Sequence, residues 1–121
     1  MPNSRLLVVK LKWGEVTLSN GQRFRDVILT PNSAKSWNWN LDGTRHDHGV
    51  TCTAVEQLID CDKIIISQGM NQVLKTKSAT IQYLIDTSKK YDICLSELAV
   101  ERYNKAVLAG ENVGLLLHST C

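Results

Sequence analysis

The side chains of this sequence that could carry chemistry are three histidines and four cysteines. His46 and His48 form an H-x-H pair, and in an extended segment their two rings would lie on one face. Cys52 nearby and His118 far along the chain would complete a set of metal ligands. Structural zinc, however, usually takes four nitrogen or sulfur ligands in closely spaced pairs, and this sequence has no C-x-x-C pair. We therefore expect no bound metal, with His46 hydrogen-bonded in a loop and His48 exposed.

A second possible chemistry is a nucleophile and base formed by Cys121 and His118. The α-carboxylate of the last residue of the sequence would disfavour a thiolate on Cys121, because two negative charges would then lie side by side. An extended strand would also place residues 118 and 121 on opposite faces. We expect no catalytic residue here. Instead we expect a packed Cys121 whose carboxylate accepts hydrogen bonds from donors such as Thr44 or His46.

The segment from Gly69 and Met70 to Thr76 has the spacing of a phosphate-binding loop, but Leu74 stands where the second glycine belongs. That glycine lets backbone N–H groups wrap around a phosphate, and a leucine side chain obstructs the wrap. The following helix is expected near Ser78, two residues later than the motif requires. We predict an ordinary turn between a strand and a helix, with no nucleotide and no other cofactor.

Basic residues on expected strands, together with two tryptophans, give one hint of nucleic-acid binding. The basic residues are Lys10, Lys12, Arg23 and Arg25. Trp37 and Trp39 could stack on bases, but the net charge of +2 is too small for a dedicated polyanion surface. Tryptophan pairs more often cover a sheet face or anchor a protein interface. We expect Trp37 and Trp39 to contact a protein partner or the core, and we expect no nucleic-acid partner.

The first fifty residues have the patterns of β-structure. Alternating apolar residues predict strands over 7–11, 16–18 and 24–30, the last of which should stop at Pro31. Asn20-Gly21 is a turn signal, because both residues tolerate positive φ. A strand over 36–40 would place Trp37 and Trp39 on one face. Residues 41–49 contain two glycines and alternating charges and are predicted to form a loop.

From residue 51 the pattern changes to alternating helices and strands. Thr53 and Glu56 have the spacing of a capping box, Ile64 to Ile66 is a buried-strand signal, and strands are also expected over 91–95 and 113–118. Ser78 and Ser96 are each expected to cap a helix, the second with Ala99, Tyr103, Ala106 and Val107 facing inward. The sequence predicts an α/β fold. An N-terminal antiparallel β-unit, about residues 1–50, packs on a βαβαβ half, about residues 51–121, within a single domain over 1–121.

Several short motifs occur together in a fixed order from Trp13 to the last residue. They are Trp13-Gly14, Phe24-Arg25-Asp26, Pro31, Trp37-x-Trp39, Gly43-Thr44-x-His46-x-x-Gly49-Val50, Gly69-Met70, Ala99-Val100-x-x-Tyr103-Asn104 and His118-Ser119-Thr120-Cys121. In these motifs the sequence resembles the adipogenesis-associated domain-containing family, small MTH-type domains of unknown function, and more distantly a mitochondrial complex I assembly factor. The resemblance implies a three-layer α/β sandwich with a mixed central sheet, and it carries no established catalytic residues.

These observations together lead to two functional hypotheses. The first is a non-enzymatic cytosolic regulatory or protein-interaction domain, self-associating weakly at most, because the eukaryotic relatives resemble regulatory or assembly proteins. The alternative is a small-molecule-binding protein or unrecognised enzyme with a polar pocket at Thr44, His46, His118 and Cys121. No apolar stretch approaches the roughly 20 residues of a membrane-spanning helix, so we expect a cytoplasmic protein with no membrane partner.

Overall fold

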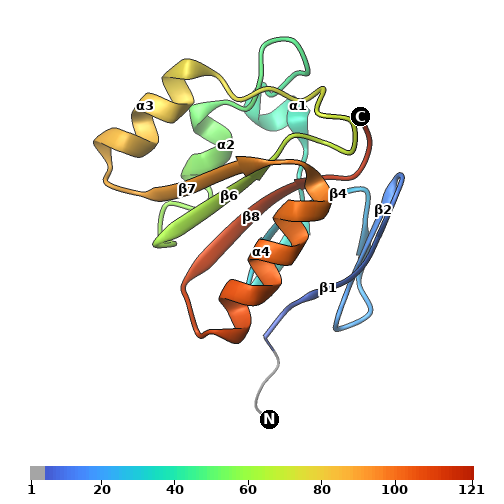
Figure 1. The fold of residues 1–121 in the computed structure, drawn as a ribbon. Coiled ribbons are helices and arrows are strands. Elements are labelled where there is room, and N and C mark those ends of the chain that lie inside the picture. Colours follow the sequence, from blue (N-terminus) through green and yellow to red (C-terminus); the bar gives the residue numbers. More distant parts are fainter. Residues whose placement is uncertain (1–4) are drawn as a thin grey trace.

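The computed structural model describes residues 5–121, so residues 1–4 of the predicted β-unit lie outside the described part (Figure 1). The strands are β1 (Val8–Lys12), β2 (Glu15–Leu18), β3 (Arg23–Phe24), β4 (Asp26–Thr30), β5 (Ser33–Ser36), β6 (Lys63–Ser67), β7 (Lys90–Cys94) and β8 (Val113–His118). The helices are α1 (Trp39–Asp42), α2 (Cys52–Glu56), α3 (Ser78–Asp86) and α4 (Ser96–Leu108). None of these helices is both long and apolar enough to cross a membrane.

The strands form two sheets, of which the larger is mixed. Its order is β5-β4-β8-β6-β7, with β6 parallel to both β8 and β7, and β4 antiparallel to β8 and β5. Strands β1, β2 and β3 make a separate antiparallel sheet. In the β4–β8 pair Asp26 lies opposite His118, so two residues that are 92 positions apart in the chain meet at one end of the central sheet.

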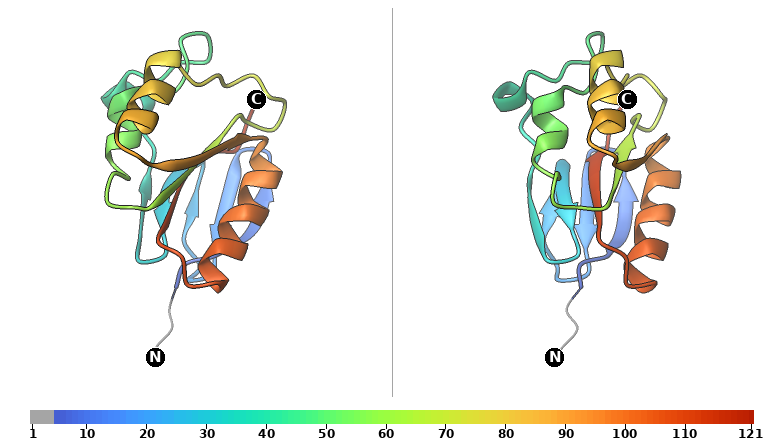
Figure 2. Two further views of the ribbon diagram at one scale, coloured as in Figure 1. Left: turned by 60° about the vertical axis from the view of Figure 1, so that its left-hand side comes forward. Right: turned by 90° about the vertical axis from the view of Figure 1, so that its left-hand side faces the viewer.

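The central sheet is the middle of three layers. Helix α4 and the small sheet cover one face, while α2 and α3 cover the other (Figures 1 and 2). Strand alternation divides the core accordingly: in β6 the Ile65 side chain belongs to the cluster under α4, whereas Ile64 and Ile66 belong to the cluster under α2 and α3. The predicted three-layer α/β fold with a mixed central sheet is confirmed.

The predicted β-unit of the first fifty residues is divided between the two sheets. The single strand expected over 24–30 is interrupted at Arg25, so that β3 pairs within the small sheet while β4 enters the central sheet beside β8. The strand expected over 36–40 is wrong. The side chain of Asn38 accepts a hydrogen bond from the Asn40 N–H and caps α1, which ends the extended chain at Ser36.

The three helix caps predicted at Thr53, Ser78 and Ser96 are also wrong. Helix α2 begins at Cys52, because the Thr51 hydroxyl accepts a hydrogen bond from the Ala54 N–H; the box expected at Thr53 and Glu56 is wrong. Ser78 and Ser96 are the first residues of α3 and α4 rather than their caps, and no side chain caps either helix. The Ser96 hydroxyl donates instead to the His118 carbonyl. The inward stripe predicted for α4 is confirmed by its buried residues, which include Ala99, Tyr103, Ala106 and Val107.

Candidate functional site at the carboxyl edge of the sheet

The polar side chains gather where strands β6, β7 and β8 end, which we call the carboxyl edge. Ser67 is the last residue of β6 and His118 the last residue of β8, and both are buried. Beyond them, residues 119–121 run beside the loop that follows β6. Open α/β sheets bind their ligands at this edge, because the loops that leave parallel strands diverge there.

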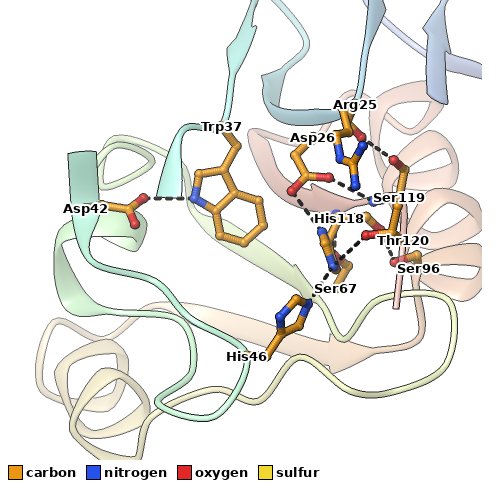
Figure 3. Close-up of polar contacts among 10 residues, drawn as sticks. All are labelled: Arg25, Asp26, Trp37, Asp42, His46, Ser67, Ser96, His118, Ser119 and Thr120. Atoms are coloured by element: carbon orange, nitrogen blue, oxygen red, sulfur yellow. Dashed lines mark hydrogen bonds and ion pairs between the residues drawn. The ribbon is translucent and has the colours of Figure 1, made fainter. Parts of the chain in front are cut away.

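Three hydrogen bonds to the backbone and ring Nδ1 hold His118 in place, and a fourth holds its partner Asp26 (Figure 3). Its ring Nδ1 lies 2.8 Å from Oδ2 of Asp26, and the other carboxylate oxygen of Asp26 accepts from the Ser119 N–H at 3.0 Å. The His118 N–H donates to the Ser67 hydroxyl at 2.8 Å, and its carbonyl accepts from the Ser96 hydroxyl at 2.6 Å. Side chains from two strands, β4 and β6, and from helix α4 therefore fix both the backbone and the ring orientation of His118.

The contact with Asp26 determines what the other ring nitrogen of His118 can do. A carboxylate only accepts hydrogen bonds, so Nδ1 carries a proton and, in the neutral ring, Nε2 presents a lone pair. That Nε2 lies 3.3 Å from Nε2 of His46 and 3.2 Å from the Thr120 hydroxyl. The two neighbours compete for a single lone pair, and the ring nitrogens of two histidines face each other.

Trp39 packs against both histidines. Its ring centroid lies 4.8 Å from that of His46 and 4.7 Å from that of His118, which places the two imidazoles beside an aromatic wall. Trp37 lies next to Trp39, is buried, and donates from Nε1 to Asp42 at 2.8 Å. Trp37 therefore belongs to the core, and Trp39 belongs to the histidine cluster.

Cys121 joins the cluster because the chain turns after β8. Its Sγ and the ring nitrogens of His46 and His118 all lie within 4.8 Å of one another. The strand ends at His118, so the prediction that residues 118 and 121 lie on opposite faces is wrong. The predicted donors to Cys121 are wrong as well: its backbone oxygen accepts from the N–H groups of Asn71 and Val73, both at 3.0 Å.

The loop after β6 binds the end of the chain rather than a phosphate. The Met70 N–H donates to the Thr120 carbonyl at 2.9 Å, so Met70, Asn71 and Val73 all direct their N–H groups at residues 120 and 121. A side chain at Gly69 would collide with the backbone of Cys121, and its φ of +86° favours glycine. The N–H groups that a nucleotide would require are already used.

Other predicted site residues lie around the cluster or away from it. Gly43 ends α1 in the left-handed region, and the buried Thr44 follows with its N–H bonded to Asp42. Within residues 5–121 the Thr44 hydroxyl has no hydrogen-bond partner. His48 is exposed as predicted, and the Cys52 thiol contacts the Ala79 carbonyl, so neither joins His46.

The four cysteines fall into two classes, and in this structure all are free thiols. Cys61 and Cys94 are buried, and burial raises the pKa of both thiols, which keeps them protonated and poorly reactive. Cys52 and Cys121 are partly exposed, and Cys121 is the one beside two imidazoles. The site can thus accept a proton at His118 Nε2, or it can offer two nitrogens and one sulfur to a cation.

Asp26 is the central site residue that chemical reasoning from the sequence missed. Nothing near it in the chain marks it as a partner of His118, since the contact depends on the pairing of β4 with β8. One signal was present: Asp26 belongs to the Phe24-Arg25-Asp26 motif that carried the family resemblance.

Comparisons with known proteins agree with this architecture. A family model described as a protein of unknown function (DUF498/DUF598) matches residues 8–118. The solved structure of MT938 is 23% identical with a TM-score of 0.73, covering 96% of this chain and 99% of its own. A Bordetella parapertussis protein is 14% identical with a TM-score of 0.80, covering 98% and 99%. A Mth938-like domain of Bordetella pertussis is 12% identical with a TM-score of 0.73, covering 98% and 89%. At these identities the likeness shows the shared fold.

Proposed function

We propose that this chain, which belongs to the DUF498/DUF598 family of proteins of unknown function, is a single-domain interaction protein that binds a protein partner through its carboxyl edge. The observation that carries the proposal is an accumulation of exposed, large apolar side chains around that edge. They are Trp13, Leu41, Val73, Leu95 and Leu98, with exposed fractions from 38% at Leu98 to 82% at Leu41. Exposed aromatic and aliphatic groups of this kind are typical anchors of protein interfaces.

Backbone contacts place these side chains around the end of the chain. Gly14, next to Trp13, donates its N–H to the Ser119 carbonyl at 3.0 Å, and Val73 donates to Cys121. Leu95 directly follows the last residue of β7, and Leu98 lies in the first turn of α4. Leu41 lies in α1, two residues after Trp39, whose ring packs against both histidines. Residues from four separate segments therefore border one polar centre, which consists of Asp26, His46, His118 and Cys121.

The proposed role is regulatory, as in the eukaryotic relatives that the sequence resembles, and the proposed location is the cytosol. The polar side chains at the edge support binding over catalysis, because Asp26, His118, Ser67 and Ser96 bind one another and the backbone. These bonds hold the edge rigid, and a preorganised surface loses less conformational entropy when it binds. Weak self-association through the same face is the simplest variant of this role.

Affinity purification of the full chain from a cell lysate, scored by quantitative mass spectrometry, tests the proposal. Trp13→Ser and Leu41→Ser should each deplete the same captured proteins several-fold, whereas Leu108→Ser should deplete none. Leu108 is a matched control, because it is 76% exposed but lies at the last residue of α4, at the opposite end of that helix. Equal depletion by all three variants would contradict the proposal. Sedimentation of the purified variants shows whether the captured partner is a second copy of the chain.

A second candidate function is binding or conversion of a small molecule at Thr44, His46, His118 and Cys121. The specific observation in its favour is that, among the described residues, the Thr44 hydroxyl and Trp39 Nε1 are buried without hydrogen-bond partners. Metabolite libraries screened by thermal shift test this candidate. A compound that stabilises the wild type but not His46→Ala supports it, and no such compound counts against it.

A further inference from the structure

We infer that Nε2 of His46, Nε2 of His118 and Sγ of Cys121 form a binding site for a zinc-class divalent cation, with Asp26 as the outer partner of His118. This inference concerns a ligand of the polar centre and does not depend on the protein partner proposed above. It differs from the ligand set suggested by the sequence, because the structure separates His48 and Cys52 from His46 and brings Cys121 in.

The distance between the two histidines has the value that a shared tetrahedral ion requires. Zinc–nitrogen bonds of about 2.0–2.1 Å at a tetrahedral angle place two ligand nitrogens about 3.3 Å apart. The two Nε2 atoms lie 3.3 Å apart. A sulfur ligand at about 2.3 Å from the same ion would lie about 3.6 Å from each nitrogen. Cys121 Sγ and one ring nitrogen of each histidine already lie within 4.8 Å of one another, so modest side-chain adjustments would close the set.

The surroundings of His118 match those of a metal-bound histidine. Such a histidine usually donates its second ring N–H to a carboxylate, which fixes the tautomer and makes the ligating nitrogen more basic. Asp26 accepts from Nδ1 at 2.8 Å, and its second oxygen is held by the Ser119 N–H. A purely structural histidine would need no such orientation of its Nε2 toward a second histidine.

Binding of a cation changes the protons of all three ligands in a defined way. Cys121 binds as a thiolate and releases one proton to solvent. His118 keeps its proton on Nδ1, bonded to Asp26, and gives its Nε2 lone pair to the ion. His46 binds as the neutral ring with its proton on Nδ1, so the hydrogen bond between the two Nε2 atoms is replaced by two metal–nitrogen bonds.

The donor set selects the class of cation and leaves one position open. Two imidazoles and one thiolate suit zinc and chemically similar transition metals, whereas magnesium and calcium prefer oxygen ligands. Three protein ligands leave a fourth tetrahedral position, as in zinc sites that bind water or an exogenous group. His46 and Cys121 are both partly exposed, so that position can be reached from solvent.

Titration of the reduced, metal-free full chain with Co²⁺, followed by displacement with Zn²⁺, tests the site. We expect one equivalent of Co²⁺ to produce the intense visible bands of a tetrahedral ion together with thiolate-to-cobalt charge transfer. Cys121→Ser should remove the charge-transfer band, and His46→Ala should weaken binding. Asp26→Asn should weaken it about 10–100-fold. His48→Ala and Cys52→Ser are the matched controls, and neither should change the spectrum.

Zinc protection of the unmodified protein from iodoacetamide supplies a measurement that needs no variant. Zinc should slow alkylation of Cys121 strongly and leave that of Cys52 unchanged, as read by peptide mass spectrometry. Absence of cobalt bands at stoichiometric metal, charge transfer that persists in Cys121→Ser, or equal protection of both thiols would overturn the inference. None of these results bears on the Trp13 and Leu41 variants, so the partner-binding proposal stands or fails separately.

Discussion

The two faces of the central sheet use the same strands for different purposes. Under α4, the cluster that includes Leu115, Leu117 and Tyr103 is apolar along the whole strand β8. On the opposite face, Leu116 belongs to an equally buried apolar cluster, but the next residue of that face is His118, bonded to Asp26 and packed against Trp39. One face is closed by apolar packing, and the other ends in a polar centre.

Strand alternation makes this division possible within six residues. Successive side chains of β8 point to opposite faces, so Leu117 completes the core under α4 while His118 reaches the polar centre. A polar residue at the last strand position can be buried because neighbouring strands supply its hydrogen bonds. The comparison predicts that substitutions under α4 affect stability alone, whereas substitutions in the polar centre affect stability and binding together.

The largest expected effect is the loss of stability on Leu115→Ala. The Leu115 side chain is fully buried beneath α4, so its truncation leaves a cavity and should lower the free energy of unfolding by about 2–5 kcal/mol. Urea denaturation measures the loss. The folded fraction should still bind Co²⁺ as the wild type does. Leu108→Ala is the control, because that side chain is largely exposed. An equally large loss of stability in Leu108→Ala, or altered cobalt bands in Leu115→Ala, would contradict the predicted difference between the two faces.

Asp26→Asn is expected to cause a smaller loss of stability together with weaker binding of Co²⁺. The amide oxygen can accept from only one side of the network, so either His118 Nδ1 or the Ser119 N–H faces the NH₂ group. One unsatisfied buried group costs about 1–3 kcal/mol of unfolding free energy, measured by the same denaturation. Asp47→Asn, an exposed change in the nearby loop, should stay within about 0.5 kcal/mol. If both variants lose equally little stability, the hydrogen bonds of Asp26 do not stabilise the folded chain.

Helix α4 allows a pH-dependent prediction for the apolar face. The buried Tyr103 hydroxyl donates to the Leu6 carbonyl at 2.8 Å, and burial raises the pKa of this phenol well above its usual value. Below about pH 10 the phenol is neutral in both the folded and the unfolded chain. As the pH rises further, the unfolded chain loses this proton first, and the free energy of unfolding falls by up to about 1.4 kcal/mol per pH unit.

Tyr103→Phe should therefore cost about 0.5–1.5 kcal/mol at neutral pH and reduce the alkaline loss of stability. Denaturation at a series of pH values measures both effects. Tyr83→Phe, a change at a tyrosine that is only partly buried, is the control. An unchanged slope in Tyr103→Phe would mean that the phenol does not stay protonated in the folded state.

Most of the fold could be predicted because it depends on local patterns. The β-branched run Ile64 to Ile66, the helix stripe around Tyr103 and the strand over 113–118 each carry the periodicity of the element that they form. The tryptophan segment was misread because alternation over five residues does not exclude a capped helical turn. There, Asn38 forms its side-chain hydrogen bond within the segment and ends the strand.

The polar centre could be predicted only in part. His46, His118, Thr44 and Cys121 were identified by residue type and by the family resemblance, but their arrangement depends on contacts between distant segments. Asp26 reaches His118 through strand pairing, and Cys121 reaches both histidines because the loop at Gly69 binds the end of the chain. No local spacing encodes either contact. His48 is separated from His46 because residues 46–48 form a turn, which is closed by the bridge between Arg45 and Gly49.

The smallest expected effect separates a binding group from a packing group in the polar centre. The Thr44 side chain is fully buried, and its hydroxyl finds no partner within residues 5–121, so it is desolvated without compensation. Valine has nearly the same shape and no hydroxyl. Thr44→Val should therefore leave the free energy of unfolding unchanged or raise it by up to about 1 kcal/mol, although threonine-to-valine changes usually destabilise where the hydroxyl is bonded.

Thr51→Val gives the contrast for Thr44→Val, because the Thr51 hydroxyl donates to the Asp42 carbonyl at 2.7 Å and caps α2. That variant should lose about 0.5–2 kcal/mol in the same denaturation. A similar loss in Thr44→Val would mean that its hydroxyl is bonded in solution, and the case for a small molecule at this position would fall. Unchanged stability, with loss of a compound that stabilises the wild type, would assign the Thr44 hydroxyl to the ligand. The face that carries His118 would then contain a buried hydroxyl that stays unpaired until a ligand binds, in contrast to the apolar packing under α4.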